Sequence, residues 1–336
     1  NPCWYTSYTP YQAEISQGRL EALLNFHTMV MELTGMELAN ASLLDESTAA
    51  AEAMIMLYNS QSKKARQELR TKFFVDEDIF PQTRALLVTR AEPLGIELLF
   101  GNYLDFHPDA SMFGAFVQYP AADGEIRDYS GFIRNAREND LSVAAAADLM
   151  SLTLLTPPGE WGADVVVGSS QRFGIPLFYG GPHAAFFATR EKFKRHLPGR
   201  IIGVSVDTEE RPALRMALQT REQHIKRERA TSNICTAQAL LASMAGMYAV
   251  YHGPKGLRRI ASNIHTGAAY LTEHLDKLGY RVVHRNFFDT LLIELPGSLS
   301  SEDIRTIAQE RQINFHYPGP QHVQLSTDET TFEEQL

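Results

Sequence analysis

The sequence predicts an α/β fold in which helices cover a mostly parallel sheet, and two observations support this. Short apolar runs recur between Thr71 and about residue 190, and helical or turn segments separate most of them. One of these runs, residues 164–168, is β-branched, ends at a glycine and leads into a polar loop. The chain has 336 residues, of which 44% are hydrophobic, so it can bury a large core in more than one domain.

The chain begins with a loop and a helix. Residues 5–12 are aromatic, polar and interrupted by Pro10, which excludes a regular helix. Two interpretations of this loop stay open: its rings pin it to the core, or they face a ligand. Residues 18–35 follow as a helix, because apolar residues recur at intervals of three and four and Gly35 is suited to end it.

A second helix is expected within residues 40–58, with Asp45, Ser47 or Thr48 as its N-cap. Small residues at a helix N-terminus can admit a phosphate group. However, Asp45 and Glu46 place negative charge there, which complements the helix dipole and repels a phosphate. We therefore predict a structural role for this helix start.

The strands of the predicted sheet are short and buried. They are expected at residues 73–75, 86–88, 98–100, 116–117, 143–147, 164–168 and 184–188. Neither GxGxxG nor GxxxxGK[ST] occurs, so no motif supports a dinucleotide site or a P-loop. The histidines lack metal-ligand spacing, and we expect no metal site.

The polar loop after residue 168 is the candidate ligand site, because α/β proteins bind ligands at the carboxyl ends of parallel strands. It contains Ser169, Ser170, Gln171 and Arg172, and a Gly-Pro turn at Tyr179–His183 follows it. The alternative is a surface loop that only joins two core strands.

The last third of the chain changes pattern. Residues 211–229 are strongly basic, which is typical of a solvated face and also suits a docking surface. A long helix is expected over residues 231–251, capped by Ser232 or Asn233 and ended by Gly253–Pro254. Beyond Leu257 we expect helices and short strands, including a strand at residues 290–295 and, after a Ser300–Ser301 cap, a helix to Arg311. We predict a large domain over residues 1–250 and a small α+β domain over 251–336.

Composition restricts the class of function. The formal net charge of −9 argues against nucleic acid as the main partner. Cys3 and Cys235 are too few for a disulfide framework and suggest reduced thiols in an intracellular protein. No apolar run approaches the roughly 18 residues that span a bilayer, and no signal peptide is apparent. Because the chain starts at Asn1 rather than Met, we expect a processed or truncated start.

Four motifs, GSSQRFG, YGGPHAAFFA, LQTREQH and TSNICTAQAL, resemble the N-terminal half of the glycine decarboxylase P-protein of the glycine cleavage system. The resemblance runs from Thr9 to about Glu329 and implies the fold of the pyridoxal-phosphate (PLP) transferases, fold type I. In that family two such halves occur in tandem or as two subunits, and the C-terminal half carries the PLP-binding lysine. It also implies that the small domain is truncated, because the chain stops before the family's last helix.

The resemblance places Gln171 where the catalytic half has its lysine, and an amide cannot form a Schiff base. Asp148 matches the aspartate that pairs with the PLP pyridine nitrogen, but here we favour a structural cap on the following turn. In fold type I dimers the glycine-rich turn after the lysine often reaches the partner's phosphate. The residues implied to face PLP in trans are Tyr8, Tyr11, Gln12, Tyr179, Gly180, Gly181 and His183.

The implied activity is PLP-dependent decarboxylation of glycine, with transfer of the aminomethyl group to the lipoyl H-protein. This half would form a wall of the site and a dimer scaffold. The implied partners are a catalytic half, H-protein, glycine and a second copy of the chain, in the cytoplasm or, in a eukaryote, the mitochondrion. The rival interpretation is a non-catalytic structural or regulatory subunit. A third, an independent PLP enzyme that uses another lysine, is disfavoured, since no lysine lies between Asp148 and Glu191.

Overall fold

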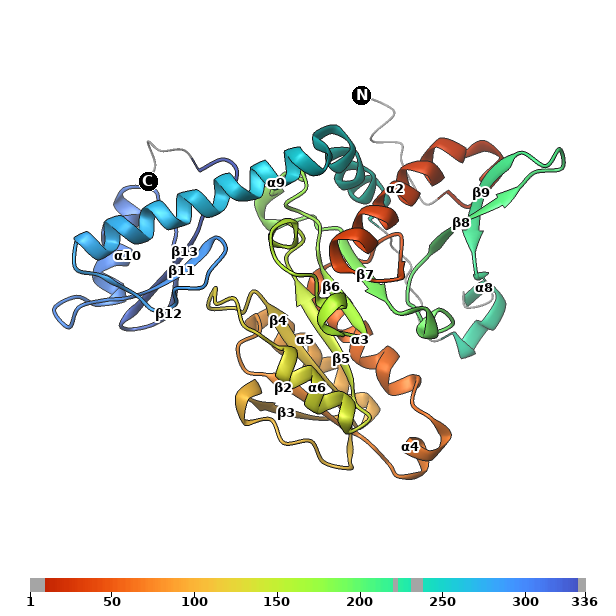
Figure 1. Ribbon diagram of the computed structural model, residues 1–336, viewed down its shortest axis with the longest axis horizontal. Helices are drawn as coiled ribbons and strands as arrows, with labels where there is room; N and C mark the ends of the chain where they lie inside the picture. Colours follow the sequence, from red (N-terminus) through yellow and green to blue (C-terminus); the bar gives the residue numbers. More distant parts are fainter. Residues whose placement is uncertain (1–9, 220–222, 231–237, 332–336) are drawn as a thin grey trace. The chain divides into compact units, whose positions relative to one another are not determined.

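The protein was analysed as a computed structural model that describes residues 10–219, 223–230 and 238–331. The chain divides into two compact units. Unit 1 comprises Asn1–Gln118 and Tyr129–Pro254, and unit 2 comprises Tyr119–Asp128 and Lys255–Leu336 (Figure 1). The sequence pattern did not predict the excursion of Tyr119–Asp128 into unit 2.

Unit 1 is built around a seven-stranded sheet with the order β1-β7-β6-β5-β4-β2-β3. Its strands are β1 (Leu38–Ala39), β2 (Lys72–Asp76), β3 (Glu97–Gly101), β4 (Met112–Tyr119), β5 (Ser142–Ala147), β6 (Val165–Ser169) and β7 (Ala185–Thr189). Strand β2 is parallel to β3 and β4, and β5 is parallel to β6. At one edge, β7 pairs antiparallel with β6 and with the two-residue β1. The predicted mostly parallel sheet is confirmed.

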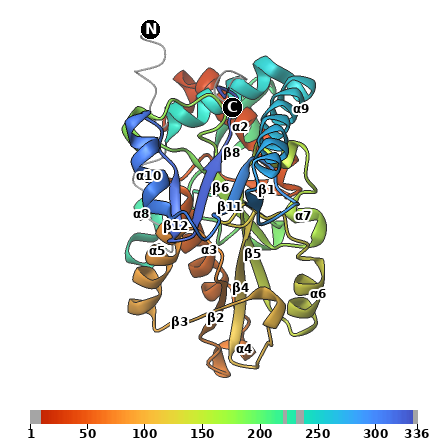
Figure 2. The same ribbon diagram turned by 90° about the vertical axis from the view of Figure 1, so that its left-hand side faces the viewer.

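Helices cover both faces of this sheet (Figure 2). Helices α3 (Glu46–Asn59) and α5 (Pro81–Ala91) lie on one side, and α6 (Ser130–Glu138) and α7 (Pro158–Trp161) lie on the other. Four alanines of α3, at positions 49–51 and 53, are completely buried. Because they have no long side chains, α3 approaches the sheet closely and packs in one cluster with Phe73, Phe116 and Val167.

The two predicted N-terminal helices are confirmed. Helix α2 covers Gln17–Thr34 and ends at Gly35, which has φ 67° and returns its N–H to the carbonyl of Met31. Helix α3 is capped by Asp45, whose carboxylate accepts from the N–H of Thr48 at 2.7 Å. The predicted α3 cap thus proves to be Asp45.

The strand predicted at residues 86–88 is wrong, since this segment lies inside α5. Three apolar residues in a row do not distinguish a strand from a buried helix. The burial of Thr83, Leu87 and Ala91, four residues apart, shows the helical period, and Pro81 at the first turn suits a helix start.

The remaining elements of unit 1 lie outside the main sheet. They include α4 (Lys63–Gln67), α8 (Gln223–Lys226), the two-stranded hairpin of β8 (Ile201–Val206) and β9 (Pro212–Ala217), and seven short 3-10 helices among the described residues. The 3-10 helices are η1 (Ala13–Ile15), η2 (Glu92–Leu94), η3 (Tyr103–Asp105), η4 (Ser151–Thr153), η5 (Phe178–Gly180), η6 (Glu191–Phe193) and η8 (Arg227–Arg229).

Helix α9 (Ala239–Lys277) contains the break that the sequence predicts at Gly253–Pro254. Gly253 has φ 63° and ψ 176°, so two helices meet there, and the second begins at once. The predicted start of the first helix, at Ser232 or Asn233, falls outside the described residues. Among the described helices, none is both long and apolar enough to cross a membrane.

Unit 2 contains a four-stranded antiparallel sheet with the order β10-β11-β13-β12. Its strands are β10 (Arg281–Val282), β11 (Thr290–Glu294), β12 (His316–Gly319) and β13 (His322–Ser326). Helix α10 (Ser301–Glu310) begins with a reciprocal capping box between Ser300 and Asp303, at the predicted cap. The predicted strand at residues 290–295 is confirmed as β11.

The excursion Tyr119–Asp128 is fastened to unit 2 by backbone and side-chain contacts. The N–H of Ile126 donates to the carbonyl of Asn286 at 2.8 Å, and Nε2 of Gln324 donates to the carbonyl of Ala122 at 2.6 Å. Gly124, with φ 91°, lies so close to Thr290 that a Cβ would come within 2.3 Å of that residue's carbonyl oxygen. Only glycine fits this crossing point.

Candidate functional site at the carboxyl edge of the sheet

Polar residues gather where β4, β5 and β6 end and where α3 begins. Gln118 is near the end of β4, Asp148 follows β5 directly, and Ser169 ends β6. Glu46, the first residue of α3, lies close enough to Gln118, Ser169 and Asp148 for their groups to affect its pKa, and its Oε1 is enclosed. The carboxyl edge is therefore a polar site, as expected from the parallel strands.

Asp148 already has partners within the chain. Its Oδ2 accepts from Nη1 of Arg172 at 2.6 Å, and its Oδ1 accepts from the N–H of Met150 at 3.0 Å. The second contact is the turn cap that the sequence predicts. The first is a charge-assisted bond that the sequence analysis missed. Both oxygens of the Asp148 carboxylate therefore already accept a hydrogen bond within the chain.

Gln171 and His183 lie together around Ser169. The hydroxyl of Ser169 accepts from the N–H of Gln171 at 3.2 Å and lies 3.4 Å from Nδ1 of His183. The side-chain amide of Gln171 donates to the carbonyl of Pro182 at 3.3 Å. The residue at the predicted lysine position thus ties the loop after β6 to the start of β7.

The turn Tyr179–His183 is most exposed at Tyr179. The Tyr179 side chain is fully exposed, and its backbone adopts the left-handed region with φ 61°. A Cβ added at Gly180 or Gly181 would meet nothing within 4 Å. A non-glycine residue with positive φ and an uncovered ring is unusual, and such features cluster at ligand clamps.

At the start of α3, one of the donors that could bind a phosphate is already used. The carboxylate of Asp45 occupies the N–H of Thr48, which is one of the donors that a helix offers to an anion. Glu46 differs from the prediction. Its Oε1 is completely enclosed, and burial, followed by the charge of Asp148, raises its pKa to about 8. At neutral pH Glu46 is therefore mostly protonated, and the predicted negative charge at this helix start belongs to Asp45 alone.

The other predicted wall residues lie in the N-terminal loop. Tyr8 falls outside the described residues. The hydroxyl of Tyr11 accepts from the guanidinium of Arg200, which also stands over the Tyr11 ring, 5.1 Å from its centroid. The ring of Tyr11 is half-exposed, and Gln12 is exposed. Tyr11 is thus held to the body of unit 1 by a cation–π contact, while its half-exposed ring leaves both interpretations of the loop open.

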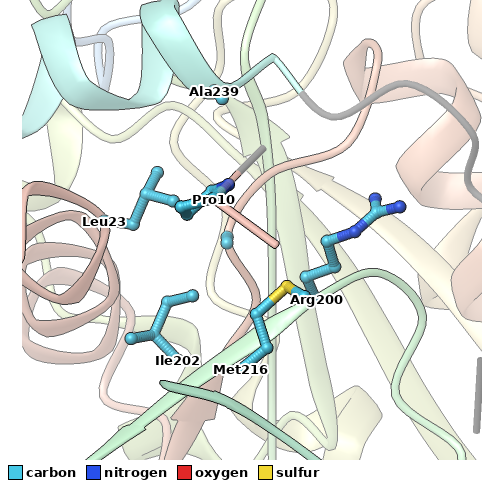
Figure 3. Close-up of a pocket in the computed structure, with 7 residues that line it drawn as sticks. Pro10, Leu23, Arg200, Ile202, Met216 and Ala239 are labelled. Carbon is cyan, nitrogen blue, oxygen red and sulfur yellow. The ribbon is translucent and has the colours of Figure 1, made fainter. Parts of the chain in front are cut away.

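A small pocket lies beside this loop (Figure 3). Its lining comes from Pro10, Leu23, Ala41, Arg200, Ile202, Met216 and Ala239. Arg200 is the one charged residue in this set, and the carboxyl-edge residues do not contribute to it. The pocket is therefore a packing gap between α2, the loop and the β8–β9 hairpin.

These residues do not fit PLP bound within this chain. Position 171 supplies no amine, Asp148 is paired with Arg172, and Asp45 occupies an amide at the start of α3. Sequence reasoning missed Gln118, the pairing of Arg172 with Asp148 and the enclosure of the Glu46 carboxyl. The one available signal was that Arg172 directly follows Gln171 in the loop at the strand ends.

Comparison with known proteins agrees with this description. The whole chain, residues 1–336, matches the family described as glycine cleavage system P-protein. It is 57% identical over 331 residues to a glycine dehydrogenase (decarboxylating) of Flavobacterium johnsoniae, covering 98% of this chain and 34% of that protein. It is 58% identical over 336 residues to that of Nostoc punctiforme, covering 100% and 34%. The chain spans about a third of the length of these relatives.

Solved structures show the same fold. A crystal structure of glycine decarboxylase (P-protein) of the glycine cleavage system, in inhibitor-bound form, matches with a TM-score of 0.89 and 35% identity, covering 98% of this chain and 76% of that chain. The aspartate aminotransferase from Thermus thermophilus matches in fold alone, with a TM-score of 0.63 and 16% identity over 92% of this chain and 85% of that one. The PLP-transferase fold predicted from the sequence is confirmed, and the chain belongs to the glycine cleavage system P-protein family.

Proposed function

We propose that this chain is the non-lysine half of a glycine decarboxylase and forms one wall of a PLP site whose lysine belongs to a second, catalytic half. The observation that carries this proposal is the exposed turn Tyr179–His183 beside a carboxyl edge at which Asp148 is already paired with Arg172. Because Asp148 is bonded within the chain while the Tyr179 ring is uncovered, this edge is suited to contact a neighbouring chain.

The proposed reaction is decarboxylation of glycine with transfer of the aminomethyl group to lipoyl H-protein, in the cytoplasm. PLP bound to the catalytic half supplies the electron sink for this chemistry. The described residues of this chain would shape the wall of the PLP site and offer hydrogen bonds to the bound groups. Gly180 and Gly181 leave room for close approach of their backbone amides to an anion, and His183 offers a ring nitrogen beside Ser169.

The experiment uses the complete enzyme, reconstituted from both halves. We expect His183→Ala or Tyr11→Phe to weaken PLP or glycine binding by between about three- and tenfold, the usual effect of one lost hydrogen bond. PLP affinity is measured by the cofactor's absorbance and glycine affinity by the KM. His107→Ala and Tyr270→Phe, exposed residues of the same types on other elements, serve as matched controls.

The alternative, a purely structural or regulatory subunit, predicts a different result. In that case the two variants alter assembly with the catalytic half, measured by sedimentation, and leave both affinities unchanged. Unchanged affinities in both variants, with correct folding by circular dichroism, would remove the wall proposal.

A further inference from the structure

The loop after β6 contacts the turn before β7 around His183. Strand β7 runs antiparallel to β6, with Ala185 opposite Ser169, so the chain passes the end of β6 as it returns. The Ser169 hydroxyl lies 3.4 Å from Nδ1 of His183. The N–H of Gln171 donates to this hydroxyl at 3.2 Å. The side-chain amide of Gln171 donates at 3.3 Å to the carbonyl of Pro182, in the peptide bond that leads into His183. Gln171 therefore bonds both to the hydroxyl beside the ring and to the peptide before it.

This end of the turn is fixed to the body of unit 1. The carbonyl of Gln171 accepts from the N–H of Ile175 at 3.1 Å, which holds the loop. The N–H and the hydroxyl of Ser170 both donate to the carbonyl of Ala184, at 2.8 and 2.6 Å. His183, which directly precedes Ala184, is half-buried. The backbone before and after His183 is therefore bonded to the loop after β6, which gives the ring a defined position.

The hydrogen bonds of Ser169 also influence where His183 carries its ring proton. A neutral imidazole has one N–H donor and one unprotonated nitrogen, and the partner of one nitrogen selects the tautomer. The Ser169 hydroxyl already accepts from Gln171, and accepting a hydrogen bond makes a hydroxyl a better donor. Its hydrogen therefore favours an unprotonated Nδ1, which leaves the ring proton on Nε2. At 3.4 Å this bond is long, so it favours one tautomer without fixing it.

We propose that Gln171 and Ser169 are positioning residues, which make Nε2–H of His183 the donor to a phosphate oxygen of the PLP bound by the neighbouring half. The inference rests on the proposed wall function and adds how its hydrogen bond is formed. Phosphate oxygens are strong acceptors, so the opposite tautomer would face them with a lone pair and lose the bond. Position 171 then has a role in this half that does not require an amine.

The tautomer is measured first, on the 336-residue chain labelled with nitrogen-15 histidine. Long-range proton–nitrogen correlation spectra, recorded at a pH that leaves the ring neutral, distinguish the protonated from the unprotonated nitrogen, and His183→Ala identifies the signal. We expect the proton of His183 mainly on Nε2. Ser169→Ala should move both nitrogen shifts toward the average of the two tautomers. Ser169→Thr, which keeps the hydroxyl, should leave them unchanged.

Thr189→Val is the matched control for the loss of a hydroxyl. It removes a group that donates to the carbonyl of Asp164 at 2.8 Å, at the other end of the same β6–β7 pair. A purely structural effect of losing such a bond would act alike at both ends of the pair, whereas positioning of the ring requires Ser169. The control should therefore leave the His183 signals unchanged.

PLP affinity is measured next, in the complete enzyme reconstituted from both halves. Ser169→Ala and Gln171→Met, which keeps the length of the side chain without its amide, should each weaken PLP binding about threefold. Both losses should vanish when His183→Ala is already present, because a positioning residue has no effect once the ring that it orients is gone.

Three outcomes would overturn the positioning roles and leave the wall function standing. They are an unchanged tautomer in Ser169→Ala, an equal change in Thr189→Val, and losses of affinity that persist beside His183→Ala. A changed tautomer with unchanged PLP affinity in every variant, His183→Ala included, would instead overturn the wall function and the phosphate contact with it.

Discussion

Gln171 combines two properties at the position that the family resemblance implies for a lysine. It offers no amine, and its side-chain amide is already bonded to the carbonyl of Pro182. Its neighbour Arg172 holds Asp148, so a lysine introduced at 171 would face an occupied carboxylate. A single replacement at position 171 therefore changes one of several groups that a cofactor requires.

We expect Gln171→Lys alone to create no activity and no specific covalent attachment of PLP. Asp148 would stay paired with Arg172, and Asp45 would still occupy the amide of Thr48. The measurement is borohydride reduction with PLP, followed by peptide mapping of this variant and of the unchanged chain. A single stoichiometric pyridoxyl-lysine in the unchanged chain would show that it is not a non-lysine half at all.

Glu46 supplies a pH-dependent test at the same scale. In the folded chain its carboxyl keeps its proton up to about pH 8, whereas in the unfolded chain it ionises near its ordinary pKa of 4.5. Its contribution to stability is therefore complete below pH 4.5 and is lost as the pH rises from 4.5 to about 8.

Glu46→Gln should remove this loss, because an amide does not ionise. We expect the free energy of unfolding at pH 7 to rise by about 1–3 kcal/mol, and the difference from the unchanged chain to vanish near pH 4. Urea unfolding at a series of pH values measures both. The quantity to compare is the stability of Glu46→Gln minus that of the unchanged chain. If this difference were smaller at pH 7 than at pH 4, Glu46 would not be protonated in the folded chain at pH 7.

At the scale of the elements, two variants at the start of α3 distinguish the stabilising effect of a charge from that of a helix cap. Asp45→Ala should cost about 1 kcal/mol of stability, because the N–H of Thr48 loses its acceptor. Asp45→Asn keeps an acceptor and should lose only a few tenths of a kcal/mol, the usual effect of a single charge at a helix N-terminus. Thermal or urea unfolding of the two variants decides; equal losses would mean that charge, and not the cap, stabilises this helix.

Elements with a clear period were predictable, and those that depend on distant residues were not. Helix α2 follows from the spacing of Leu23, Phe26 and Val30 and from Gly35. The strand predicted at residues 86–88 was wrong because a run of three apolar residues carries no period. These residues lie in helix α5, which is buried against α3.

At the candidate site, the positions of Gln171 and Asp148 were accessible from the sequence. The protonation of Glu46 was not, because it arises from burial and from the charge of Asp148, which only the folded chain brings together. The pairing of Arg172 with Asp148, 24 residues earlier in the chain, has the same origin. Local sequence patterns therefore predicted where the site lies. Contacts between residues far apart in the sequence determine the protonation and the pairing of its side chains.

At the scale of the whole molecule, α9 leaves an apolar face uncovered. Met247, Val250 and Tyr251 are 43%, 63% and 85% exposed and share one side of the helix by their spacing. We predict that the chain alone self-associates as a homodimer through such surfaces. Sedimentation should show a dimer at micromolar concentration, and Val250→Lys with Tyr251→Lys should dissociate it. A stable monomer of the unchanged chain would count against this prediction.

The excursion Tyr119–Asp128 also has a consequence for the order of synthesis. Ala122 is translated 202 residues before its partner Gln324, and Ile126 long before Asn286. At about 5–20 residues per second, this segment waits roughly 10–40 seconds for its partner strands to leave the ribosome. Unit 2 thus cannot be completed by the end of the chain alone, because it needs a segment that left the ribosome with the unit 1 sheet.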